Sequence, residues 1–154
     1  MGLYFTLQAL GSLAAGLTLG RVADRFGRRP VVSLGMAGLT LAMVLLAVAT
    51  NAFVLLVSAV LAGYSVSGAR NGMAAWTADR APPHERGAAL TTTSMGFDIG
   101  VSVGSFALAA VVPQFGIAAG FLLAAAVPLV GAVVSVLFLT DLPRAEASAR
   151  PAGY

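Results

Sequence analysis

The stretch GRVADRFGRRP, residues 20–30, is the strongest indication of the fold because it concentrates charge between two long apolar runs. It holds four of the nine basic residues of the chain and one of its six acids. Each Arg costs roughly 2.5–3.5 kcal/mol at the centre of a transmembrane helix, so this stretch cannot lie in hydrocarbon. We expect it to be a loop at a membrane surface, and the apolar runs on either side to cross the membrane.

The composition supports a membrane protein. The 154 residues are 58% hydrophobic and 10% charged, whereas soluble domains carry about 25% charged residues. The absence of Cys excludes disulfides and thiolate metal sites, and with one His and no Lys we expect no metal and no cofactor. The net charge is +3, but the arginines do not form a basic face with interleaved aromatic residues. We therefore expect contact with membrane lipid and none with nucleic acid.

Apolar runs separated by charges, prolines and short turns predict an all-α membrane protein with five transmembrane helices. We expect one helical domain over residues 1–140, followed by a disordered polar tail at 141–154. The predicted spans lie at about 2–19, 31–50, 52–78, 87–112 and 117–140.

The arginines predict the orientation of these spans. The connections after the first and third spans hold six arginines, and the tail holds two more. The turns at 50–51 and 114–116 hold none. The positive-inside rule therefore places the basic connections and the C-terminus in the cytoplasm, and residue 1 outside. The use of Arg without Lys and the richness in Ala, Gly and Val favour the inner membrane of a bacterium.

A family resemblance rests on the same charged stretch. Its residues match the pattern G-x-x-x-D-R-x-G-R-R, which resembles the cytoplasmic-loop signature of the major facilitator superfamily; they are Gly20, Asp24, Arg25, Gly27, Arg28 and Arg29. The sequence FDIG at 97–100, followed by Gly104, resembles the penultimate helix of sugar-efflux-like and drug-efflux-like members.

The resemblance implies half of a major facilitator fold, which has six helices. Five spans correspond either to helices two to six or to helices eight to twelve, with one further helix expected before residue 1. The short polar tail and the FDIG context favour the second half.

The motif has a physical interpretation of its own. The Asp24 carboxylate could accept hydrogen bonds from the N-terminal amides of a neighbouring helix. Arg25, Arg28 and Arg29 could pair with acids or with lipid phosphates, and glycines permit a close backbone approach. The resemblance implies a cytoplasmic gate latch. The alternative is a basic anchor that fixes orientation and does nothing more.

Polar residues inside the predicted spans indicate a cavity. Asp98 lies eleven residues after Gly87, or about 16 Å along a helix. At 100° per residue one face collects polar side chains, and the opposite face forms a small-residue ridge expected to pack on another helix. The polar face holds Thr91, Ser94, Asp98, Ser102 and Ser105, and the ridge holds Gly96, Gly100 and Gly104. In the first span, Gln8 and Ser12 share a face and are further cavity candidates.

Arg70 lies at a comparable depth in the third span. A charged residue inside the membrane is a candidate functional residue because its cost must be offset. Arg70 and Asp98 could form a structural ion pair between helices. Alternatively, Arg70 could attract an anion, or Asp98 could load a proton that couples to transport.

The resemblance implies part of a secondary active transporter, in which proton-coupled efflux by alternating access moves a small-molecule substrate. The resemblance implies that the other half of the transporter is a partner. The alternative is a membrane scaffold or assembly subunit that transports nothing. No nucleophile–base pair can be assembled from the sequence, so we expect neither catalytic residues nor an enzyme.

Overall fold

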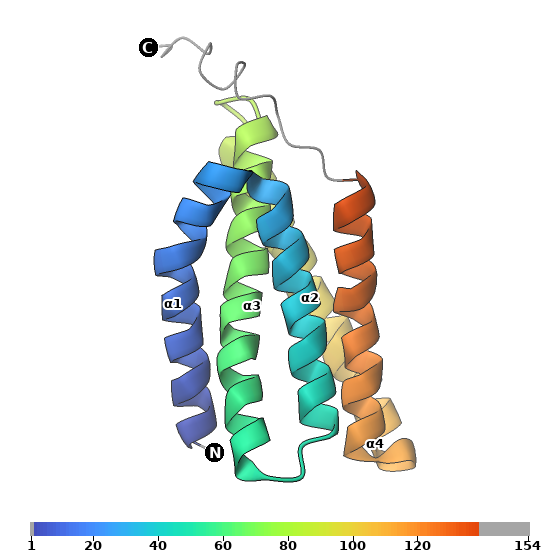
Figure 1. Cartoon of the computed structure of the whole chain (residues 1–154). Coiled ribbons are helices and arrows are strands. Elements are labelled where there is room, and N and C mark those ends of the chain that lie inside the picture. The colour runs from blue at the N-terminus through green and yellow to red at the C-terminus, as the bar shows by residue number, and fades with distance from the viewer. Residues whose placement is uncertain (1, 139–154) are drawn as a thin grey trace.

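A computed structural model describes residues 2–138, without the side chains of Asp24, Phe26 and Phe138. Within this range the chain is helical and has no strand (Figure 1). The helices are α1 (Gly2–Phe26), α2 (Arg28–Ala47), α3 (Ala52–Arg80) and α4 (Arg86–Phe138). All four are long and apolar enough to cross a membrane, which confirms the all-α membrane class. The predicted tail at 141–154 lies outside the described residues.

The five predicted helices are not confirmed as five separate elements, because the described range has four and α4 joins two helices across a kink at Gly116. The predicted spans 87–112 and 117–140 both belong to α4, which continues through Pro113 and changes direction at Gly116. Gly116 has φ 84° and ψ 168°, a conformation open to glycine and strained for other residues. One residue therefore reverses the chain, so no separate loop forms between the two parts of α4 (Figure 1).

The charged stretch is also more helical than predicted. α1 continues through Gly20 to Phe26, and α2 begins at Arg28, so Gly27 alone separates them. Gly27 has φ 97°, which again requires glycine. The expectation of a loop over the whole stretch was wrong because nothing between Gly20 and Phe26 breaks a helix, and a helix end can extend beyond the hydrocarbon. Pro30 lies in the first turn of α2, where its missing N–H costs no hydrogen bond.

The helices run antiparallel, so their connections gather at two ends of the bundle (Figure 1). At one end lie the α1–α2 junction, the 81–85 connection and the end of α4. We call this the basic end. At the other end lie residue 2, the α2–α3 turn and Gly116. The α2–α3 turn is set by Asn51, whose side-chain oxygen accepts a hydrogen bond of 3.0 Å from the Val54 N–H and so caps α3.

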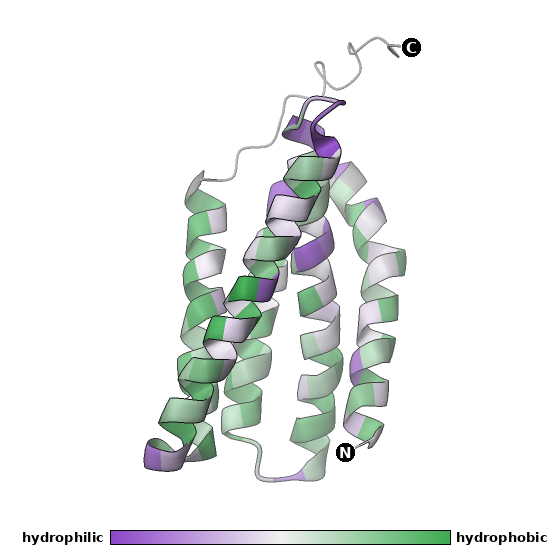
Figure 2. Ribbon diagram, turned by 180° about the vertical axis from the view of Figure 1, so that it is seen from behind, coloured by the Kyte–Doolittle hydropathy of each residue, from purple (hydrophilic) through white to green (hydrophobic). Residues whose placement is uncertain are grey.

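The best packed part of the bundle is the crossing of α3 with α1 and α2. Small residues bring the backbones together: a Cβ on Gly63 would lie 2.8 Å from the Gln8 carbonyl carbon, and one on Gly35 would lie 2.6 Å from the Ala69 nitrogen. Small-residue interfaces of this kind are typical of helices packed inside membranes. The outward faces carry large apolar side chains, and hydrophilic residues gather mainly at the basic end (Figure 2).

Candidate functional site

The basic end joins three helices through the two arginines that open α2. The Arg28 Nε donates a hydrogen bond of 3.3 Å to the Asp79 Oδ2 in the last turn of α3. The Arg28 and Asp79 side chains are 28% and 49% exposed, so this ion pair contributes no more than about 1 kcal/mol. The ion pair mainly fixes the position of the start of α2 relative to the end of α3.

Arg29 makes the second connection. Its guanidinium donates a hydrogen bond to the backbone carbonyl of Val136, in the last turn of α4. Carbonyls in the last turn of a helix lack partners within the helix and carry the negative end of its dipole. The positive end of the α2 dipole disfavours cations at the start of α2. The negative ends of the α3 and α4 dipoles lie beside Arg28 and Arg29 and offset that cost.

The other motif residues occupy varied settings. Arg25 lies exposed in the last turn of α1, where the helix dipole favours a cation. Gly27 makes the tight turn described above. Gly20 has open space where a Cβ would stand, so the close backbone approach predicted there is not seen within the described part of the structure. The side chain of Asp24 lies outside the described part of the structure, and the predicted bond to helix amides stays a prediction.

The polar face of α4 lies on the surface of the bundle. All five of its side chains are exposed: Thr91, Ser94, Asp98, Ser102 and Ser105. The Ser102 hydroxyl donates to the Asp98 backbone carbonyl at 2.9 Å, so it is satisfied within its own helix. The Asp98 carboxylate therefore lies on an outer surface, in the middle of an apolar helix.

Among residues 2–138, no other helix packs on the predicted glycine ridge. Cβ atoms built on Gly96, Gly100 and Gly104 would meet nothing within 4 Å. Contact between α4 and α3 passes instead through neighbouring positions, among them Thr93, whose hydroxyl lies 3.3 Å from that of Thr77. The ridge was predicted from spacing alone, and spacing does not say which helix, if any, covers it.

Arg70 does not form the predicted ion pair with Asp98 in the described structure. Its guanidinium lies instead 4.9 Å from the ring centroid of Phe97, the residue before Asp98, in a cation–π contact. The two charges are on adjacent helices, but Arg70 turns to the aromatic face and both side chains remain exposed. The roles proposed for them as separate charges stay predictions.

In α1, the cavity candidates lie at the crossing with α3. The Ser12 hydroxyl donates a hydrogen bond of 3.0 Å to the Gly63 carbonyl, and the backbone of Gln8 packs against Gly63. Both side chains are half-buried. The hydrogen bond to α3 accounts for a polar residue at Ser12. A cavity role for Gln8 or Ser12 stays a prediction.

Sequence reasoning missed three partners of the candidate residues: Asp79, Phe97 and the Val136 carbonyl. Asp79 could have been found, because an antiparallel hairpin brings the end of α3 beside the start of α2. Phe97 could have been suggested by its place next to Asp98. The Val136 carbonyl leaves no signal, since every residue has one.

The fold and this arrangement define a multi-pass membrane protein with a basic end. A family model described as Major Facilitator Superfamily matches residues 1–153. The chain belongs to this superfamily, as its motif predicted, and is not an enzyme.

The curated relatives are bacterial transporters. The chain is 31% identical over 137 residues to a 4-hydroxybenzoate transporter of Acinetobacter baylyi, covering 86% of this chain and 29% of the relative. It is 30% identical over 145 residues to multidrug resistance protein 2 of Bacillus subtilis, covering 92% and 35%. A gallate transporter of Pseudomonas putida is 30% identical over 107 residues, covering 70% and 24%. The chain thus spans about a quarter to a third of the relatives' length.

Proposed function

We propose that this chain is part of a secondary active transporter that moves a small solute by alternating access, as a proton-coupled efflux system of the bacterial inner membrane. The observation that carries the proposal is the exposed polar face of α4. A carboxylate such as Asp98 is expensive against lipid, so in the membrane this face must meet water or protein. A second helical bundle placed against α4 would enclose an aqueous path lined by Ser94, Asp98 and Ser102.

The basic end acts as the latch of this transporter, on the cytoplasmic side together with the C-terminus. In support, Arg28 and Arg29 hold together the ends of three helices through one ion pair and one carbonyl contact. Contacts of this size can be broken and remade during a transport cycle, because neither is buried deeply. The helices α1, α2 and α3 and the two parts of α4 correspond to helices eight to twelve of the fold, and the other half is the partner that faces α4.

The substrate class follows from the names of the relatives. They include transporters of 4-hydroxybenzoate and gallate and a multidrug resistance protein. We propose an aromatic or amphiphilic organic solute, exported in exchange for protons that load on Asp98. The scaffold alternative receives no support from relatives that are named as transporters and pumps.

The test is an efflux assay on cells that express the complete gene product containing this chain. Cells are loaded with ethidium, and its loss is followed with and without a protonophore, beside a parallel arm with radiolabelled 4-hydroxybenzoate. We expect protonophore-sensitive efflux, abolished by Asp98→Asn because the amide cannot carry a proton. The matched control is Thr92→Val, at an exposed position on another face of α4.

Each other outcome contradicts a separate part of the proposal. Wild-type efflux in Asp98→Asn would remove Asp98 from the coupling mechanism. Insensitivity to the protonophore would exclude proton coupling. Accumulation of 4-hydroxybenzoate in energised cells would reverse the direction, and transport of neither probe, with stable expression, would favour the scaffold.

A further inference from the structure

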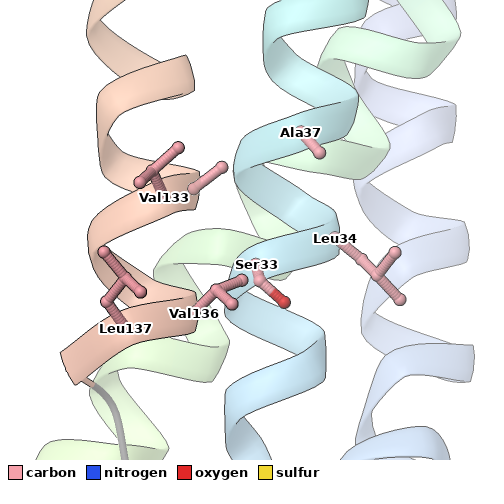
Figure 3. Close-up of a pocket in the computed structure, with 7 residues that line it drawn as sticks. Ser33, Leu34, Ala37, Val133, Val136 and Leu137 are labelled. Atoms are coloured by element: carbon pink, nitrogen blue, oxygen red, sulfur yellow. The ribbon is translucent and has the colours of Figure 1, made fainter.

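A groove between α2 and the second part of α4 opens just beyond the basic end. Its volume is about 390 Å³, within the range of small-molecule sites. Its lining comes from two helices and is apolar apart from one hydroxyl (Figure 3). The lining residues are Ser33, Leu34, Ala37, Ala132, Val133, Val136 and Leu137. The Ser33 hydroxyl donates 3.2 Å to the Pro30 carbonyl, so even this polar group is satisfied locally.

The groove leads directly to a guanidinium. Arg29, Ser33 and Ala37 follow one another at intervals of four residues and so lie along one stripe of α2. Arg29 donates to the carbonyl of Val136, which is itself a lining residue. Arg29 therefore lies at the end of the groove nearest the membrane surface. From there the groove extends along α2 toward the hydrocarbon region.

The groove opens near the basic end, which carries a net positive charge. Within the described residues the basic end carries six arginines (21, 25, 28, 29, 80 and 86) against three acids (24, 79 and 85). Basic pockets between transmembrane helices favour anionic lipid head groups, and each Arg near the membrane surface contributes about 1 kcal/mol. An apolar groove that ends in positive charge complements a molecule with an apolar chain and an anionic head.

We propose that this groove is a binding site for an anionic phospholipid. The first part of one acyl chain lies between α2 and α4, against Ala37 and Val133, and the phosphate lies at the membrane surface near Arg29. The groove lies between α2 and the second part of α4, whereas the exposed polar side chains belong to the first part of α4. The lipid site is therefore separate from the proposed transport path.

The test is native mass spectrometry of the full chain in detergent, titrated with phosphatidylglycerol or with phosphatidylcholine of the same acyl chains. We expect phosphatidylglycerol to bind more tightly. Arg29→Gln should weaken its binding about fivefold, the equivalent of one lost charge contact. The matched control is Arg21→Gln at the same end, because the Arg21 guanidinium bonds within its own helix, to the Leu17 carbonyl.

A second pair of variants tests the groove without changing charge. Ala37→Trp should fill the groove and weaken phosphatidylglycerol binding, whereas Ala14→Trp, on an exposed face of α1, should not. This pair decides the outcome if Arg29→Gln fails to fold, as judged by helical circular dichroism. Equal binding of the two lipids, equal effects of a variant and its control, or full competition by glycerol phosphate without acyl chains would overturn the proposal.

Discussion

α3 and the first part of α4 both carry glycines at helical spacing, yet the two sets have different surroundings. In α3, Gly63 lies against the backbone of α1, and a Cβ on Gly72 would meet Val32 of α2 at 2.9 Å. In α4, the spaces beside Gly96, Gly100 and Gly104 are open. Glycines at helical spacing therefore lie in a close helix–helix contact in α3 and on an uncovered surface in the first part of α4.

The first part of α4 therefore presents two uncovered surfaces, the glycine ridge and the polar face on its other side. A lipid-facing helix needs neither, since apolar side chains of any size suit hydrocarbon. Both surfaces are explained if α4 lies beside protein that this chain does not supply, as the proposed second half would. Substitutions of glycines in α3 and α4 therefore test whether the two surfaces differ in this way.

The largest effect is expected from Gly63→Val. Its Cβ would collide with the backbone at Gln8, which cannot move aside as a flexible side chain would. We expect a loss of about 3 kcal/mol, at the upper end of ordinary overpacking effects. The measurement is the free energy of unfolding in mixed micelles, with the yield of monodisperse protein beside it.

The control for this variant is Gly16→Val, at a position of α1 with nothing within 4 Å. It changes the same residue type without a clash. If both variants unfold alike, the contact between α1 and α3 does not explain the cost.

Gly116→Ala should have an intermediate effect. No atom crowds this glycine, but φ 84° with ψ 168° is strained for alanine, at a cost of about 1–3 kcal/mol. The same unfolding measurement applies. Gly87→Ala, at an uncrowded position in the first turn of α4, is the matched control, and an equal loss there would show that backbone conformation at Gly116 is not the cause.

The smallest effect is expected from Gly100→Ala. A Cβ there meets open space, so the isolated chain should lose no stability and could gain up to about 1 kcal/mol from helix propensity. In the complete gene product the same change should reduce stability if another bundle packs on the ridge. Equal behaviour in both settings would contradict a covered ridge.

Much of the fold could be predicted from sequence because apolar length and charge position are strong signals in a membrane protein. The all-helical class and the superfamily are confirmed. The predicted count of five helices is not confirmed, because α4 joins two helices across Gly116 without a loop. The predicted extent of the motif loop was wrong, because Gly27 alone separates α1 from α2.

The site was less predictable, because side-chain direction depends on neighbours. Periodicity identified the polar face of α4, and its side chains share an exposed setting. It could not tell that Arg70 turns toward Phe97 rather than Asp98. Nor could it predict the hydrogen bond from Arg29 to Val136, since the acceptor is a backbone carbonyl, which every residue carries.

The Arg29–Val136 contact has a consequence for biosynthesis. Its two residues are 107 positions apart, whereas Arg28 and Asp79 are 51 apart. At about 5–20 residues per second, translation reaches Val136 about 5–20 s after Arg29. The first three helices can thus associate in the membrane while the ribosome is still producing the fourth. Arg29 can form its bond to the Val136 carbonyl only after the end of α4 has been synthesised. A stall in translation within that interval would release a chain whose basic end is only half assembled.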